Sequence, residues 1–129
     1  MKLPLIPISW GELFDKITIL QIKLENIKEK NALKNVKTEH DQLYSIFNKV
    51  FFENTTANQL MNDLKLINEK LWNIEDLIRD KERNKVFDTE FIELARKVYF
   101  TNDERSRIKR DINETFGSEL IEEKSYADY

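Results

Sequence analysis

The side chains best suited to chemistry lie between residues 68 and 79 and share a helical spacing. Asn68, Trp72, Glu75 and Arg79 follow one another at intervals of four, three and four residues, so they form one stripe on an α-helix. An indole ring beside amide, carboxylate and guanidinium groups could bind a small polar ligand. The alternative is an ordinary Glu75–Arg79 pair, worth about 0.2–0.5 kcal/mol, with the indole covering the edge of a core.

Basic side chains form a second candidate site. Arg105 and Lys109 flank an apolar helical face, and Arg96 precedes them. If these groups turn inward, they could bind a carboxylate or a phosphate. Acidic residues interleave with the bases, which is equally typical of a solvated face and argues against a groove for nucleic-acid phosphates. The candidate pocket has Arg79, Arg96, Arg105 and Lys109 as cations, Trp72 and Tyr99 as walls, Asn68 as a polar neighbour, and Asp15, Glu75 and Asp103 as groups that orient the bases.

Metal and catalytic motifs are poorly represented. His40 is the only histidine and cysteine is absent, so zinc sites and Glu-x-x-His di-iron pairs cannot be assembled. Glu119 and Glu122 have the spacing of a helical pyrophosphohydrolase pair, but no second pair matches them. No glycine-rich phosphate loop or serine-hydrolase elbow is present. We therefore expect no metal and no cofactor, favour a protein that is not an enzyme, and expect His40 to be exposed.

The composition indicates a large solvated surface. Of the 129 residues, 35% are charged, against about 25% in an average protein, which suits long paired helices. The net charge of −3 provides no overall field for nucleic acid. The apolar start is broken by Pro4 and Pro7 and differs from a signal peptide, and no stretch approaches the roughly 20 apolar residues of a membrane span. The lack of cysteine is compatible with a reducing compartment, so we predict a cytoplasmic protein.

Helices are the elements that must position these groups. Both prolines lie in the first seven residues, and no glycine lies between Gly11 and Gly117, so the interior lacks helix breakers. Ser9 with Glu12 forms a capping box, Thr101 with Glu104 repeats it, and Gly117 suits a helix C-terminus. The pattern predicts one all-α domain over residues 1–129: an antiparallel bundle of long coiled-coil-like hairpins with four to five helices. The predicted elements are an extended arm over 1–8, helices over about 10–30, 32–52, 57–85, 89–100 and 102–116, and an acidic-aromatic tail over 118–129.

The first predicted helix is apolar on two sides. Ile19 and Ile22 lie about 160–200° from the seam that contains Ile17 and Leu20, at 100° per residue. Such a helix is either sandwiched inside its own bundle or shared with a second copy. Homodimerisation through the Ile19 and Ile22 face is therefore one prediction. The aromatic residues of the tail predict that it packs on the bundle or meets a partner.

Five separated segments are distributed over nearly the whole chain: Ser9–Leu20, Leu71–Asp76, Phe91–Arg96, Asn102–Arg105 and Glu122–Tyr126. Together they resemble an uncharacterised bacterial domain-of-unknown-function family of short proteins. The resemblance implies no established activity, and it implies relatives encoded near surface-polysaccharide and glycosyltransferase genes. A weaker likeness, of architecture only, is to the helical chorismate mutases, small dimers whose basic groups hold a dicarboxylate. Their motif does not match this sequence position by position.

Two functions remain open at this level. The first is a non-catalytic helical interaction or accessory module, linked to bacterial surface-polysaccharide synthesis, that binds a protein partner or a second copy but no nucleic acid. The second is a small helical-bundle enzyme or ligand-binding protein with an Arg/Lys-lined pocket for an anionic small molecule. Because buried like charges are costly unless each is paired, the positions of the basic side chains should distinguish the two.

Overall fold

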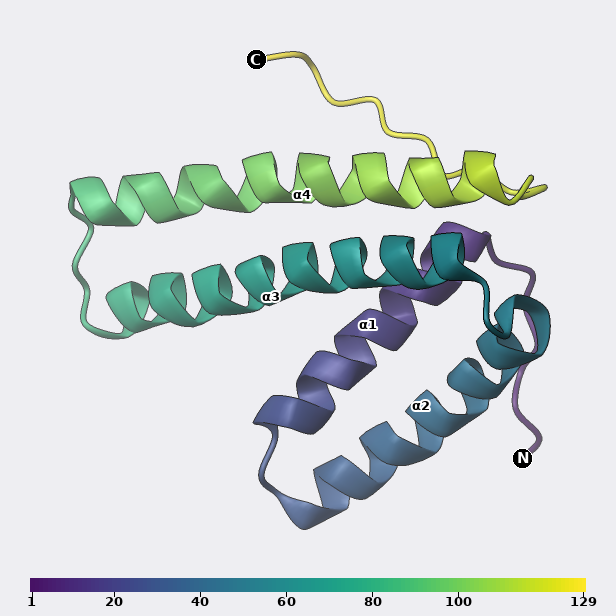
Figure 1. Cartoon of the computed structure of the whole chain (residues 1–129). Helices are drawn as coiled ribbons and strands as arrows, with labels where there is room; N and C mark the ends of the chain where they lie inside the picture. Colours follow the sequence, from purple (N-terminus) through teal and green to yellow (C-terminus); the bar gives the residue numbers. More distant parts are fainter.

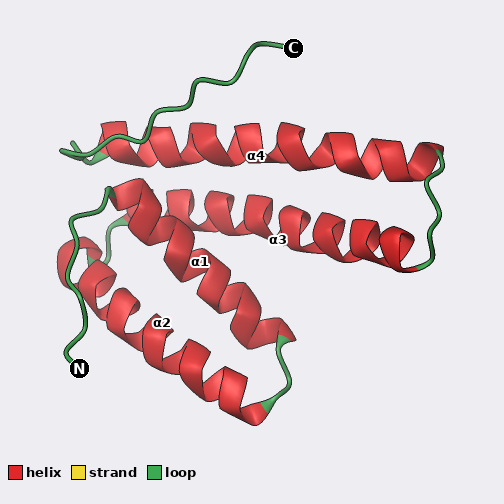
Figure 2. Ribbon diagram, turned by 180° about the vertical axis from the view of Figure 1, so that it is seen from behind, coloured by secondary structure: helices red, strands yellow, loops and turns green.

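The chain folds into four helices that form two antiparallel hairpins (Figures 1 and 2). A computed structural model describes all residues from Met1 to Tyr129. The helices are α1 (Trp10–Asn26), α2 (Lys30–Phe51), α3 (Thr55–Arg83) and α4 (Thr89–Thr115). The prediction of an all-α protein built from antiparallel helical hairpins is confirmed. None of the four helices combines the length and the hydropathy that crossing a membrane requires.

The ends of α1 follow local side-chain chemistry. The Ser9 hydroxyl accepts a hydrogen bond from the backbone N–H of Glu12 at 3.1 Å, as the capping box predicts. Ile27 has an extended conformation and ends the helix. The Glu29 carboxylate then caps α2 by accepting from two backbone N–H groups of its first turn. The first two predicted segments are therefore separate helices, and α1 ends four residues before the predicted end at residue 30.

The predicted break at Thr101 is wrong, because α4 runs without interruption from Thr89 to Thr115. Thr101 is only 7% exposed and lies seven residues after Leu94 and seven before Ile108, in one continuous helical packing stripe. Packing along this stripe keeps the helix continuous through Thr101, although the local sequence resembles a capping box. The fourth and fifth predicted helices are one element.

The core forms where α1 meets the other three helices. Phe14 is fully buried, and its ring packs edge-on against Phe47 and Phe51 of α2, with centroids 5.1 and 5.3 Å apart. On the other side of α1, Ile22 is only 2% exposed. The two apolar sides of α1 are thus explained by its position between α2 and the α3–α4 hairpin. Ile22 is buried within its own chain, whereas Ile19 is only partly buried, so homodimerisation through this face stays a prediction.

Gly117 ends α4 as predicted. It has a φ of +61°, and the N–H of Ser118 bonds to the carbonyl of Asn113 at 2.8 Å, which is a Schellman motif. The chain then reverses, and the tail runs back over the side of α4 that faces away from α3 (Figure 1). The same figure shows the α3–α4 hairpin extending well beyond α1 at its far end.

Candidate functional site

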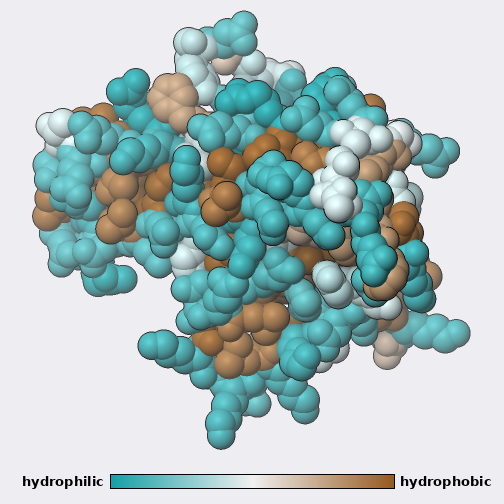
Figure 3. All heavy atoms as spheres, in the orientation of Figure 1, coloured by the Kyte–Doolittle hydropathy of each residue, from teal (hydrophilic) through white to brown (hydrophobic).

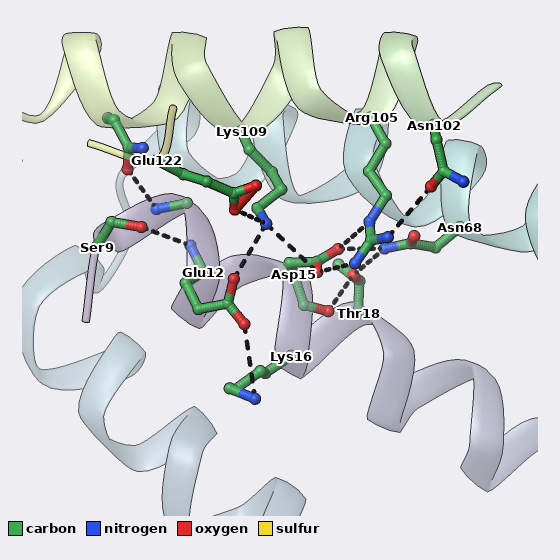
Figure 4. A network of polar contacts seen from close by, with 12 residues as sticks. Ser9, Glu12, Asp15, Lys16, Thr18, Asn68, Asn102, Arg105, Lys109 and Glu122 are labelled. Carbon is green, nitrogen blue, oxygen red and sulfur yellow. Dashed lines mark hydrogen bonds and ion pairs between the residues drawn. The ribbon is translucent and has the colours of Figure 1, made fainter. Parts of the chain in front are cut away.

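A buried polar cluster joins α1 to the α3–α4 hairpin (Figure 4). Gly11, Asp15, Thr18 and Ile22 lie at intervals of four, three and four residues, so they occupy one side of α1. Asp15 is 2% exposed and Thr18 is fully buried. A carboxylate at such a position requires partners of opposite charge or hydrogen-bond donors.

Asp15 receives those partners from two helices. The Nε and Nη2 atoms of Arg105 both donate to its carboxylate, the first at 2.9 Å, in the bidentate geometry that favours arginine. The Nδ2 group of Asn68 donates to Asp15 and to the Thr18 hydroxyl, each at 2.9 Å. The hydrogen bonds from Arg105 to Asp15 raise the pKa of the guanidinium group. The Asp15 carboxylate therefore fixes α1 against both α3 and α4.

Lys109 extends the cluster along α4. Its side chain is 10% exposed, and its Nζ lies 3.0 Å from a carboxylate oxygen of Glu12 and 3.0 Å from one of Glu122. Burial opposes the charge, but the hydrogen bonds to Glu122 and Glu12 outweigh that effect and raise the pKa of Lys109. Asp15 is a more distant partner at 3.9 Å. Lys109 thus connects the start of α1 with the C-terminal tail.

Gly11 permits a close approach between α1 and α4. A Cβ atom at this position would lie 2.6 Å from the carbonyl oxygen of Lys109. The Gly11 N–H donates to the side-chain oxygen of Asn113 at 2.7 Å, which satisfies one of the free donors at the start of α1. The buried Asn113 is 2% exposed. The contact places Glu12 and Asp15 within reach of Lys109.

A cleft with a volume of about 420 Å³ opens beside this cluster, between α1 and the α3–α4 hairpin. The volume lies within the range of about 300–1,000 Å³ typical of ligand sites. Arg105 and Asn68 belong to both the cluster and the cleft. The residues that line it are Ile19, Ile22, Asn68, Leu71, Trp72, Glu75, Asp76, Arg79, Asn102 and Arg105.

The polar groups of the cleft offer both donors and acceptors. The Nη1 group of Arg105 makes only a long bond of 3.4 Å to Asn102, so it can donate to a ligand. Arg79 is paired with Glu75 at 3.0 Å, but its side chain is 75% exposed. Asp76 adds a carboxylate at the same surface. The cleft therefore presents a balanced set of charges rather than a purely cationic pocket.

Half of the predicted site residues meet in this cleft. Asn68, Trp72, Glu75, Arg79 and Arg105 line it together. Asp15 orients Arg105 from behind, as proposed for a carboxylate in this role. Lys109 lies in the adjoining cluster and is turned toward Glu12 and Glu122.

The other predicted residues lie elsewhere on α4. The guanidinium carbon of Arg96 lies over the ring of Phe100, 5.6 Å from its centroid. Tyr99 packs edge-on against Tyr129 of the tail, with centroids 5.4 Å apart, and the Tyr129 hydroxyl donates to Asp103. The four cations therefore do not converge on one anion. His40, expected to be exposed, has a side chain only 16% exposed because its ring stacks on Tyr44.

Several members of the cluster were not predicted. Glu12, Thr18, Asn113 and Glu122 all hold or orient the buried charges. The signal for Thr18 is present in the sequence as polar or small residues at helical spacing, since it shares one face of α1 with Gly11 and Asp15. No comparable pattern identifies Glu122, because its contact depends on the reversal of the chain after α4.

Comparison with known proteins identifies the family but no activity. Residues 4–129 match the family described as "Family of unknown function (DUF6165)", and the chain belongs to this family. No curated protein and no solved structure matches the chain.

Proposed function

We propose that this DUF6165 protein is a non-catalytic helical binding module that takes a small polar ligand in the cleft beside Trp72. The observation that carries the proposal is the convergence of Trp72, Asn68 and Arg105 from two helices on one concave surface. An indole ring provides an apolar face for a ligand, and the polar groups around it fix the orientation of the ligand.

The balance of charges favours a ligand rich in hydroxyl groups. Arg105 is already neutralised by Asp15 and Arg79 is paired with Glu75, while Asp76 lies on the same surface. An anion would meet these carboxylates, whereas a hydroxyl group can both donate and accept hydrogen bonds. A neutral saccharide is therefore the first ligand to test. The gene neighbourhood implied by the family resemblance supports the same choice and suggests an accessory role in surface-polysaccharide synthesis.

The pairing of the basic groups weakens the enzyme alternative. An electrostatic catalyst requires cations aimed at the reacting atoms, but Lys109 is held by Glu12 and Glu122. Arg96 lies on a different part of α4. The proposal of a four-cation catalytic pocket for an anionic substrate accordingly has less support than a binding site.

The two tryptophans of the chain allow a direct test. Trp10 packs on Phe51, with ring centroids 5.2 Å apart, so Trp10→Phe keeps a core aromatic ring and leaves Trp72 as the sole indole. Titration with a panel of neutral saccharides should change the fluorescence of this variant in a saturable way. A bound ligand at 100 times its Kd should also stabilise the protein by about 2.7 kcal/mol, measurable as a rise in Tm.

Trp72→Phe is the matched control. It keeps Trp10 as the reporter and a ring at the cleft, so its fluorescence should not respond to the same ligands. Equal responses from the two variants would place the ligand elsewhere. A flat titration together with an unchanged Tm across the panel would contradict the proposal.

A second candidate is a protein partner. Apolar side chains remain exposed among hydrophilic ones over both hairpins (Figure 3). At the far end of the α3–α4 hairpin, Leu77, Phe87 and Ile92 are 54–56% exposed. Apolar surface of this kind marks contact sites in many proteins. Pull-down with the tagged chain, compared with a Phe87→Ser/Ile92→Ser variant, tests this candidate: a partner retained equally by both proteins would exclude the hairpin end.

Two further properties stay predictions. A homodimer that uses the Ile19 and Ile22 face would contact mainly Ile19, because Ile22 is buried, and sedimentation equilibrium measures its mass. Cytoplasmic location is expected from the cysteine-free composition, and fractionation of cells that express the protein tests it.

A further inference from the structure

The C-terminal tail occupies a basic surface of α4. Ser106, Lys109, Arg110 and Asn113 lie at positions i, i+3, i+4 and i+7, so they form one stripe on the helix. We call these four residues the α4 stripe. Together with Arg107 and tail residues 122–124, they line a pocket of about 180 Å³. This pocket is separate from the cleft beside Trp72, with which it shares no residue.

The tail contributes two carboxylates to the lining of this pocket, and both bind the α4 stripe. Glu122 accepts from Lys109 at 3.0 Å, and Glu123 accepts from two nitrogens of Arg110 at 3.4 Å. Figure 4 shows Lys109 reaching Glu122 on one side and Glu12 on the other. The stripe therefore already binds oxyanions, and its occupants come from its own chain.

These contacts are weak enough to exchange. The side chains of Glu122 and Glu123 are 43% and 73% exposed, and exposed ion pairs add little stability. Every residue from Glu119 to Tyr129 is exposed. Beyond the two carboxylates, the tail is held by the bond from the Trp10 N–H to the Ser118 hydroxyl and by the contacts of Tyr129 with Asp103, Tyr99 and Phe100. A segment with so few buried contacts opens locally at low free energy.

We propose that the α4 stripe is a binding site for phosphate-bearing ligands and that the tail occupies it in their absence. A phosphate group carries about −1.5 to −2 charges and three strong acceptor oxygens, so it can replace two singly charged carboxylates. Lys109 keeps Glu12 as a partner when the tail leaves, which avoids an unpaired buried charge. Arg107 and Arg110 supply exposed positive charge at the rim of the pocket. The carboxylate of Glu114, 3.3 Å from Arg110, offsets part of this charge.

The test compares the full-length chain with its Glu122→Gln/Glu123→Gln variant. Inorganic phosphate, titrated by calorimetry at constant ionic strength, should bind the variant about three- to tenfold more tightly, because two exposed ion pairs no longer compete. In the unmodified chain, phosphate should release the tail, seen as sharpened NMR resonances of residues 119–129. Adding Arg107→Gln/Arg110→Gln to the double variant should abolish the gain.

Three results would overturn the proposal. The first is equal phosphate affinity of the unmodified chain and the Gln variant, and the second is undiminished binding after loss of Arg107 and Arg110. The third is release of the tail by sodium chloride at the same ionic strength as by phosphate, which would indicate screening alone. All four substituted residues lie at exposed positions, and circular dichroism confirms the fold of each variant.

Discussion

Replacing Asp15 with asparagine should destabilise the protein strongly, although the change is almost isosteric. Asp15 is 2% exposed and accepts two hydrogen bonds from Arg105 and one from Asn68. Breaking a buried ion pair by removing one partner costs about 3–5 kcal/mol. The side chain of Arg105 is 28% exposed, so water can solvate the outer edge of its guanidinium group. We therefore expect about 3 kcal/mol, from a total stability of about 5–15 kcal/mol.

Urea unfolding followed by circular dichroism measures this loss as a lower midpoint at an unchanged m-value. Glu75→Gln is the matched control, because it removes a carboxylate from the exposed pair with Arg79. Its effect should stay below about 0.5 kcal/mol. A loss of under 1 kcal/mol for Asp15→Asn would refute the conclusion that this ion pair fixes α1 to α4.

A double-mutant cycle separates the pair from its surroundings. Asp15→Leu and Arg105→Met should each destabilise the protein, because each leaves the other charge without its partner. The double variant should lose clearly less than the sum of the two single losses, since buried pairs can be replaced by apolar residues at small cost. Additive losses would mean that the two side chains contribute independently.

Further predictions concern the packing and the charges. Gly11→Ala should lower the free energy of unfolding by about 1–3 kcal/mol, because its Cβ would lie 2.6 Å from the backbone oxygen of Lys109. Gly117→Ala has open space around the new Cβ but a φ of +61°, so it should lower the free energy of unfolding by about 1 kcal/mol. Urea midpoints of the two variants measure both losses. Because the pKa of Lys109 is raised in the folded protein, this residue should contribute its full stabilisation below about pH 10.4, the pKa of an unfolded lysine. The contribution should be lost as the pH rises through the folded pKa. Lys109→Met should therefore flatten the alkaline limb of a plot of the urea midpoint against pH. Hydrogen bonds from the Phe91 backbone N–H and the Lys81 side chain lower the pKa of Asp88. The stabilisation by Asp88 should therefore be present above about pH 3.9, the pKa of an unfolded aspartate, and lost as the pH falls through the folded pKa. Asp88→Asn should flatten the acid limb of the same plot.

The helix ends that depend on local chemistry were predictable from the sequence. Ser9 starts α1, and Gly117 ends α4 with the expected left-handed conformation. Thr101 misled the prediction because a capping-box pattern describes only the residues within one turn. Thr101 is buried in a stripe that continues on both sides, on a helix that packs against both α3 and α1. Tertiary packing therefore overrode the local signal.

The candidate site was predictable within one helix and not between helices. The stripe from Asn68 to Arg79 follows from periodicity alone, and the cleft contains all four of its members. Arg105 joins them because α3 and α4 are antiparallel with a particular register, which the hairpin loop sets and no residue pattern reveals. Arg96 could have been excluded once α4 was taken as continuous, because nine residues separate it from Arg105 by about 13.5 Å along a helix.

The double role of Arg105 links the stability of the fold to the proposed binding site. Its Nε and Nη2 atoms are held by Asp15, so Nη1 is directed to the side of Asn102 and the cleft. A ligand that accepts from Nη1 meets a donor whose conformation is already fixed, and binding then costs little side-chain entropy. Arg79, with 75% exposure, must be ordered by the ligand itself. The buried cluster thus does more than fasten α1, because it determines which of the two arginines can anchor a ligand.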